Sequence, residues 1–223
     1  MARSREGRPD EGRRSQRRGP DGPRRGLLID WGGVLTTDLF ASFASFCEVE
    51  GLEPAKVREL FRGDEAARSL LVEFECGRVD EPEFERRFAP MLGVPDEGLV
   101  ERMFAGSAPD ARMLGAVKAA RDAGVKTGLI SNSWGVHRYP QDLMDELFDG
   151  VVISGLVGIR KPSAEIYSMG AEAIGLPPGE CVYVDDLGFN LKPAKELGMA
   201  TILHSDSEQT VAQLEELLGV ALS

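Results

Sequence analysis

The sequence has few of the residues that build disulfide frameworks and zinc centres. Its 223 residues include three cysteines (Cys47, Cys76 and Cys181) and two histidines (His137 and His204). The cysteines are odd in number and far apart, with no Cys-x-x-Cys pair, so we expect no disulfide framework and a reducing, cytoplasmic setting. The histidines are too far apart in sequence to give a zinc motif.

Long apolar runs are missing as well. No stretch approaches the roughly 20 apolar residues that a membrane-spanning helix needs. The N-terminus carries positive charge but lacks the apolar segment of a secretory signal. We therefore expect no membrane segment. The 42% of hydrophobic residues is instead sufficient for a sizeable globular core.

Basic residues are concentrated at one end of an otherwise acidic chain. Residues 1–25 contain nine arginines and four acidic residues, a balance of +5, and the other 17 basic and 33 acidic residues give −16, for a total of −11. An acidic body is a poor match for a nucleic-acid backbone or an anionic membrane surface, so neither is expected as a partner. Residues 1–25 are rich in Arg, Gly and Pro with few apolar side chains, which predicts a disordered tail.

The first half of the remaining sequence reads as one strand followed by helices. The apolar run 27–29 ends at Asp30, which predicts a buried strand and then a turn. From residue 38 to residue 106 the apolar side chains follow helical spacing, with no convincing strand. Five helices are expected in this segment, over about 39–46, 54–61, 70–74, 80–92 and 96–104.

From residue 109 onward, apolar strands alternate with helices. The predicted strands are 127–130, 151–153, 181–184 and 200–203, and the predicted helices are 110–123, one after Pro162, one after Asp186 and one from about Ser207. Strands that alternate with helices predict an α/β fold, with a parallel sheet covered by helices on both faces.

Polar side chains stand where the predicted strands end. Asp30, Ser131 and the pair Asp185-Asp186 each follow an apolar run. Because ligands of such sheets sit outside the carboxyl ends of the strands, these residues predict a shared site. Trp134, close behind Ser131, is expected to pack against the protein rather than to line the entrance.

Four segments, in this order, resemble the motifs of one enzyme family. They are 28–35 (LIDWGGVL), 131–132 (SN), 158–162 (GIRKP) and 184–199 (VDDLGFNLKPAKELGM). They make residues 26–220 similar to the haloacid dehalogenase-like (HAD) hydrolase superfamily, and most similar to the subgroup with the N-terminal phosphatase-like domain of soluble epoxide hydrolase. The resemblance implies a HAD-like Rossmannoid core over 26–37 and 107–223, with residues 38–106 inserted as an all-helical cap.

The resemblance also implies the roles of the catalytic residues. Asp30 is the nucleophile that attacks phosphorus and becomes an aspartyl phosphate, which splits one difficult step into two. Ser131 donates a hydrogen bond to the transferring phosphoryl group, and Asn132 supplies another donor through its backbone N–H. Lys161 neutralises the cluster as a compact positive charge. Trp31 is expected to contact the substrate together with Asn132.

A magnesium site is implied at the same strand ends. Adjacent carboxylates repel each other unless a cation lies near them, and Mg²⁺ prefers oxygen ligands. By resemblance the ligands are Asp30, the main-chain carbonyl of Gly32 and Asp186. Asp185 is a direct or indirect partner of the ion, and Asn190 orients the acid pair.

One position departs from the family pattern. The phosphatases of the family carry a second Asp two residues after the nucleophile, where this chain has Gly32. That Asp protonates the leaving oxygen and later activates water, assistance worth about 10²–10⁴-fold. Slow turnover of substrates with poor leaving groups is therefore expected.

Three functions remain open. The sequence favours a Mg²⁺-dependent phosphatase that acts on a small phosphorylated metabolite. A dehalogenase is a second possibility, although the dehalogenases of the family usually carry Tyr where this chain has Gly32. The third is a non-catalytic domain that keeps the phosphate pocket.

Overall fold

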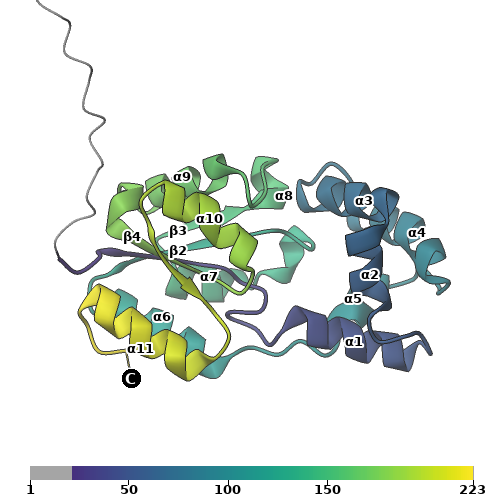
Figure 1. The fold of residues 1–223 in the computed structure, drawn as a ribbon, viewed down its shortest axis with the longest axis horizontal. Coiled ribbons are helices and arrows are strands. Elements are labelled where there is room, and N and C mark those ends of the chain that lie inside the picture. The colour runs from purple at the N-terminus through teal and green to yellow at the C-terminus, as the bar shows by residue number, and fades with distance from the viewer. Residues whose placement is uncertain (1–21, 223) are drawn as a thin grey trace, which may run out of the picture.

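The protein is built on a five-stranded parallel sheet (Figure 1). The computed structural model describes residues 22–222. In chain order the strands are β1 (Gly26–Ile29), β2 (Lys126–Ser131), β3 (Gly150–Ile153), β4 (Cys181–Asp185) and β5 (Ala200–Leu203). Their order in the sheet is β3-β2-β1-β4-β5, so β1 lies at the centre and pairs with both β2 and β4.

Helices cover both faces of the sheet (Figure 1). One face packs against α6 (Ala111–Asp122), α7 (Gln141–Leu147) and α11 (Ser207–Leu218), and the other against α9 (Ala164–Ala173) and α10 (Gly188–Glu196). Successive strand residues point to opposite faces, so Leu27 and Ile29 join the first core and Leu28 joins the second. This arrangement confirms the predicted α/β fold class.

Short elements complete the core. They are the helix α8 (Ser154–Val157) and two 3₁₀ turns, η1 (Val136–Arg138) and η2 (Pro178–Glu180). Neither α7 nor α8 was predicted. With seven and four residues they are too short for a clear helical repeat of apolar side chains.

Five helices form a second body beside the carboxyl ends of the strands (Figure 1). They are α1 (Leu39–Val49), α2 (Lys56–Gly63), α3 (Glu65–Glu75), α4 (Glu81–Leu92) and α5 (Leu99–Phe104). Their apolar faces enclose a separate core that includes Phe74, Phe84 and Phe88. We refer to residues 38–106 as the cap.

Aspartates set the starts of several helices. In each case the side-chain oxygen accepts a hydrogen bond from a backbone N–H of the first turn, which satisfies a donor that has no partner inside the helix. The capping residues are Asp38, Asp64, Asp80, Asp110 and Asp206.

Two cap helices begin later than the sequence predicted. The fifth helix starts at Leu99 rather than Asp96, because Gly98 adopts a left-handed conformation (φ 59°) that a helix cannot continue through. The second starts at Lys56 rather than Pro54, since Lys56 donates its N–H to the Glu53 carbonyl in a preceding turn.

A tryptophan from the core joins the two bodies. Trp134 follows β2 in the chain, but its ring lies 5.3–6.1 Å from the rings of five cap phenylalanines. These are Phe43, Phe61, Phe74, Phe84 and Phe104. The expected packing role of Trp134 is therefore correct, and its partners belong to the cap. Trp134 also lines the cavity around Asp30 that is described below, a position that was not expected.

The folded part begins before Gly26. The backbone N–H of Arg24 donates to the Leu217 carbonyl (2.8 Å), and that of Arg25 donates to the Glu180 carbonyl (3.0 Å). The prediction of a disordered tail is thus wrong for these two residues, which backbone pairing holds without apolar side chains. Residues 1–21 of that tail lie outside the described residues. Among the helices of residues 22–222, none has the length and apolar character to cross a bilayer.

Candidate active site

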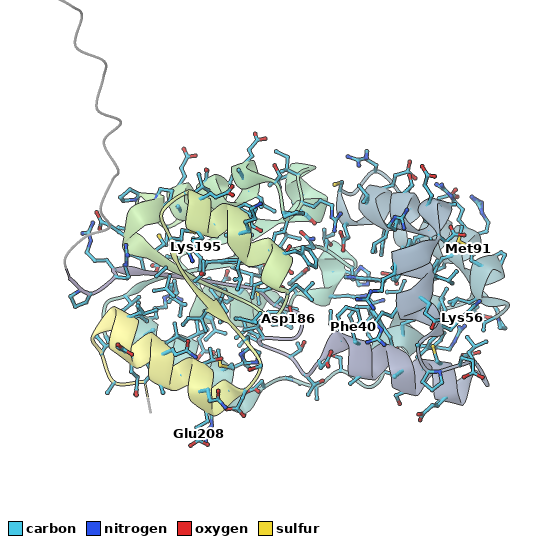
Figure 2. The ribbon with its side chains drawn as sticks, viewed as in Figure 1. Phe40, Lys56, Met91, Asp186, Lys195 and Glu208 are labelled. Carbon is cyan, nitrogen blue, oxygen red and sulfur yellow. The ribbon has the colours of Figure 1, made fainter. Side chains whose placement is uncertain are left out.

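The fold brings four sequence-predicted polar residues to one edge of the sheet. Asp30 directly follows β1, Ser131 ends β2, and Asp185 ends β4 with Asp186 beside it. The Asp30 N–H donates to the Val184 carbonyl across the β1–β4 pair (3.0 Å). Figure 2 labels Asp186 at the edge of the core that faces the cap.

Lys161 lies between two of these carboxylates. It comes from the loop between α8 and α9, and its side chain is 1% exposed. Its Nζ lies 2.7 Å from Asp30 Oδ1 and 2.8 Å from Asp185 Oδ2. Burial disfavours the charged ammonium, but Asp30 and Asp185 more than offset this and raise the pKa of Lys161. Lys161 therefore remains positively charged in the buried site.

Asp185 is fully buried and its oxygens are already engaged. Both oxygens accept hydrogen bonds from the protein, which places this carboxylate as an organiser of the site rather than a readily available ligand. The donors are Lys161 Nζ, Tyr183 Oη, the Leu187 N–H and Asn190 Nδ2. Asn190 thus lies where the resemblance implied, with its amide on the Asp185 carboxylate at 3.0 and 3.1 Å.

Acidic groups outnumber basic groups at the strand ends. Oxygens of Asp30, Asp185 and Asp186 lie within 4.8 Å of one another, beside the single ammonium of Lys161. Burial raises the pKa of Asp30 well above its ordinary value, and Asp185 and Asp186 add to this against the opposing effect of Lys161. Burial and Asp185 likewise raise the pKa of Asp186 to about 6. A divalent cation would relieve this repulsion, so the donor set fits a hard metal ion.

Two adjacent glycines shape the loop after Asp30. Gly33 has φ 73°, and a Cβ there would lie 2.5 Å from Asp186 Oδ2. Only glycine therefore fits this position without strain or displacement of the carboxylate. Gly32 has no such φ, but its Cβ would lie 2.6 Å from Leu39 Cδ1 of the cap. The space that a side chain at position 32 would use is filled by the cap.

Ser131, Asn132 and Trp31 hold different positions around this cluster. Ser131 Oγ lies 2.9 Å from Tyr139 Oη, and the strand that Ser131 ends pairs with the strand that Asp30 follows. The Asn132 side chain pairs with the main chain of Lys161, accepting from its N–H (2.8 Å) and donating to its carbonyl (3.2 Å). The backbone N–H of Trp31 donates to Asp30 Oδ1 (2.7 Å), and Trp31 lines an adjoining cavity with Tyr139.

A cavity of about 450 Å³ lies between the core and the cap. It contains Asp30, Gly32, Ser131, Asn132, Lys161, Asp186 and Asn190 from the predicted site, so the structure brings these residues together. Trp31 lines only the adjoining cavity, and Asp185 lies beneath the surface. The cap contributes apolar walls that include Leu39, Phe40, Phe43, Phe61 and Leu71, and two arginines, Arg58 and Arg62.

Several residues at the site were not found from the sequence. Tyr183 lies two residues before Asp185 on β4, on the same side of the strand, and its hydroxyl donates to the Asp185 carboxylate. Burial raises the pKa of Tyr183. Burial likewise raises the pKa of Tyr139, to about 12. The two phenols therefore act as neutral hydrogen-bonding groups. Glu75 and Arg160 form an ion pair between the cap and the core, which no local sequence pattern indicates.

Comparison with known proteins now decides the family. A family model described as haloacid dehalogenase-like hydrolase matches residues 25–198. The chain belongs to the haloacid dehalogenase-like hydrolases. The resemblance seen in the four motifs is thereby confirmed, and the chain is a hydrolase by family.

Curated relatives agree with the predicted subgroup. The bifunctional epoxide hydrolase 2 of Sus scrofa is 37% identical over 117 residues, which cover 49% of this chain and 21% of that protein. A sesquiterpene phosphatase of Aspergillus oryzae is 28% identical, over 66% of this chain and 78% of its own length. A glyceraldehyde 3-phosphate phosphatase of Methanocaldococcus jannaschii is 31% identical, over 44% of this chain and 49% of its own length.

Solved structures share the HAD fold. An enzyme of the family from Bacteroides thetaiotaomicron superposes with a TM-score of 0.64 at 22% identity, covering 82% of this chain and 95% of the other. A predicted HAD-like hydrolase from Porphyromonas gingivalis superposes with a TM-score of 0.69 at 20% identity, over 88% and 98%. The Bacteroides enzyme has also been solved with magnesium and inorganic phosphate.

Gly33 provides a test of the acidic cluster. We expect Gly33→Ala to lose at least about 1 kcal/mol through the positive φ, and to abolish the magnesium-induced rise in melting temperature because its methyl group displaces Asp186. Thermal melts with and without Mg²⁺ measure both effects. Gly115→Ala is the matched control: its Cβ meets nothing within 4 Å inside α6, so it should gain about 0.5–1 kcal/mol. An undiminished magnesium response in Gly33→Ala would contradict the assigned geometry.

The crowded carboxylates also predict the pH dependence of stability without metal. Asp30 and Asp186 have pKa values raised above the ordinary 3.8. The folded state therefore binds more protons than the unfolded state, and the free energy of unfolding falls as pH rises from about 4 through 6 and beyond. In EDTA, Asp30→Asn should therefore melt higher than wild type at pH 8, with a smaller difference at pH 5. Mg²⁺ should reverse the order at pH 8. If Asp30→Asn melts lower than wild type in EDTA at pH 8, the prediction is wrong. The ion pair between Lys161 and Asp30 would then contribute more to stability than the repulsion among the acids costs.

Proposed function

We propose that this hydrolase is a Mg²⁺-dependent phosphatase that works through an aspartyl phosphate on Asp30. The observation that carries the proposal is the way Asp30 is held. Within residues 22–222, its recorded partners, Lys161 and the Trp31 N–H, both contact Oδ1. The other oxygen, Oδ2, remains available at the cavity for attack on phosphorus.

The chain's own residues supply most of the chemistry. Lys161 opposes the rise that burial causes in the pKa of Asp30, and it offers positive charge to the phosphoryl oxygens. The Ser131 hydroxyl and the Asn132 backbone N–H add donors where negative charge grows. Asp30, Asp186 and the Gly32 carbonyl would hold the metal, with Asp185 organising them. When bound, Mg²⁺ supplies Lewis-acid stabilisation of the phosphoryl oxygens.

Relatives support a phosphorylated substrate. Phosphatases recur among the proteins similar to this chain, one named for a sesquiterpene and one for glyceraldehyde 3-phosphate. The cavity adds a second argument, because aromatic and aliphatic side chains form the walls that the cap contributes. We infer that the substrate is a small phosphate monoester whose alcohol has an apolar part.

The two other functions left open by the sequence differ in their products. A dehalogenase would release halide from a 2-haloacid, with attack on carbon instead of phosphorus. A non-catalytic domain would bind inorganic phosphate with Mg²⁺ but release no product. The buried Lys161–Asp30 pair favours catalysis, since burying a charged nucleophile costs stability that binding alone does not require.

The first functional prediction concerns Asp30 and the metal. With acetyl phosphate or p-nitrophenyl phosphate, the wild type should release phosphate only in the presence of Mg²⁺, and EDTA should abolish the activity. Asp30→Asn should lose far more than the tenfold that about 1.4 kcal/mol represents, while remaining folded. Full activity in excess EDTA, or halide release without phosphate release, would contradict the phosphatase proposal.

The second prediction concerns the apolar wall. Phe189 lines the cavity mouth and is 60% exposed, so Phe189→Ser should cost little stability. It should raise KM for an apolar phosphate monoester by up to about tenfold, because the substrate loses the binding free energy of a partly buried aromatic contact. KM for acetyl phosphate should not change. Leu156→Ser is the control, since Leu156 is 68% exposed and lies outside the cavity. An equal change in KM for both substrates would rule out the apolar subsite.

A further inference from the structure

The cavity contains one carboxyl group outside the acidic cluster. Gly32 offers no side chain to move a proton at the position where related phosphatases carry Asp. Among the described residues that line the cavity, Asp30 and Asp186 belong to the cluster, and the remaining acid is Glu75. Glu75 is the last residue of α3 in the cap and is 5% exposed.

We propose that Glu75 is the acid–base catalyst of this site and replaces the carboxyl group that Gly32 lacks. The proposal rests on the phosphatase function proposed above and concerns only its proton transfers. It revises the expectation that substrates with poor leaving groups turn over slowly.

Three contacts fix Glu75 to the core although it belongs to the cap. Ser154 Oγ donates to its main-chain carbonyl, Arg160 Nε pairs with its carboxylate, and Asn132 Nδ2 lies 3.4 Å from Oε2. The Asn132 side chain also accepts from the Lys161 N–H (2.8 Å), and Lys161 Nζ reaches Asp30 (2.7 Å). A short chain of contacts therefore positions Glu75 relative to the nucleophile.

The surroundings of Glu75 suit a group that both gives and takes a proton. Burial raises the pKa of Glu75 to about 7, against the opposing effects of Arg160 and then Lys161. Among the described residues, the ionisable groups that face Glu75 are these two cations and the phenol of Tyr139. Both protonation states are thus populated near neutral pH, which is the condition for efficient acid–base catalysis.

The proton balance is simple. In the first half-reaction, an Asp30 oxygen forms a bond to phosphorus, the phosphorus–oxygen ester bond breaks, and the leaving oxygen takes the proton from Glu75. In the second, the Glu75 carboxylate takes a proton from water as the water oxygen bonds to phosphorus. The acyl–phosphate bond to Asp30 then breaks, which releases inorganic phosphate and restores both carboxyl groups.

Rapid-quench kinetics of Glu75→Gln test the proposal, with the full chain in Mg²⁺. With p-nitrophenyl phosphate, whose leaving group needs no proton, the variant should release a burst of product at nearly the wild-type rate. Its steady-state rate should fall by about 10²–10⁴-fold, because water is no longer activated. With butyl phosphate, the first step itself should slow by a similar factor. The wild-type steady-state rate should rise as pH passes about 7, and this limb should be lost in the variant.

Glu81→Gln is the matched control. Glu81 also joins the cap to the core, through Arg138 Nη2 at 2.7 Å, but it does not line the cavity that contains Asp30. Its replacement should leave the ratio of burst to steady state unchanged. Gly32→Asp added to Glu75→Gln should restore part of the steady-state rate, once Leu39 shifts to make room.

The outcomes separate the two proposals. Equal slowing of burst and steady state in Glu75→Gln, or no slowing of either, contradicts the role of Glu75 and leaves the phosphatase intact. The same holds for a wild type that hydrolyses p-nitrophenyl phosphate but not butyl phosphate. A wild type with no magnesium-dependent burst contradicts the phosphatase function itself.

Discussion

The buried ammonium of Lys161 is the interaction on which the rest of the site depends. Its Nζ lies 2.7 Å from Asp30 and 2.8 Å from Asp185, so one positive charge contacts two acids at the ends of adjacent strands. Burial raises the pKa of Asp30, and Lys161 opposes that rise. Three acids lie beside this one cation. Because hydrogen bonds engage both oxygens of Asp185, Asp30 and Asp186 are the acids that would hold a metal ion.

Much of this arrangement was predictable from the sequence, because it depends on where apolar runs end. Asp30, Ser131 and Asp185 each terminate or follow a strand, and parallel strands bring their carboxyl ends together. Glu75 could not be found in this way. It is a polar residue at the end of an amphipathic cap helix, and its proximity to Lys161 results from how the cap docks. The side chain of Asn132 is a similar case, since its pairing with the main chain of Lys161 depends on loop geometry and not on residue type.

Gly32 fits its surroundings closely. Leu39, at the start of the first cap helix, occupies the space that a side chain at position 32 would enter. Gly32 and Leu39 are therefore complementary, so restoring a carboxyl group at position 32 requires movement in the cap. Figure 2 shows this boundary, with Phe40, the next residue of that helix, labelled on the cap side and Asp186 on the core side.

The packing of Trp134 among the cap phenylalanines ties the cap to the loop after β2. The tryptophan lies two residues beyond Asn132, so the loop that carries Ser131 and Asn132 ends inside the hydrophobic interior of the cap. A cap taken from a relative would need aromatic side chains that contact Trp134 in the same way, or it would leave a void around the ring. The cap and this loop therefore pack as a single unit, so a change of side chain on one side alters the packing on the other.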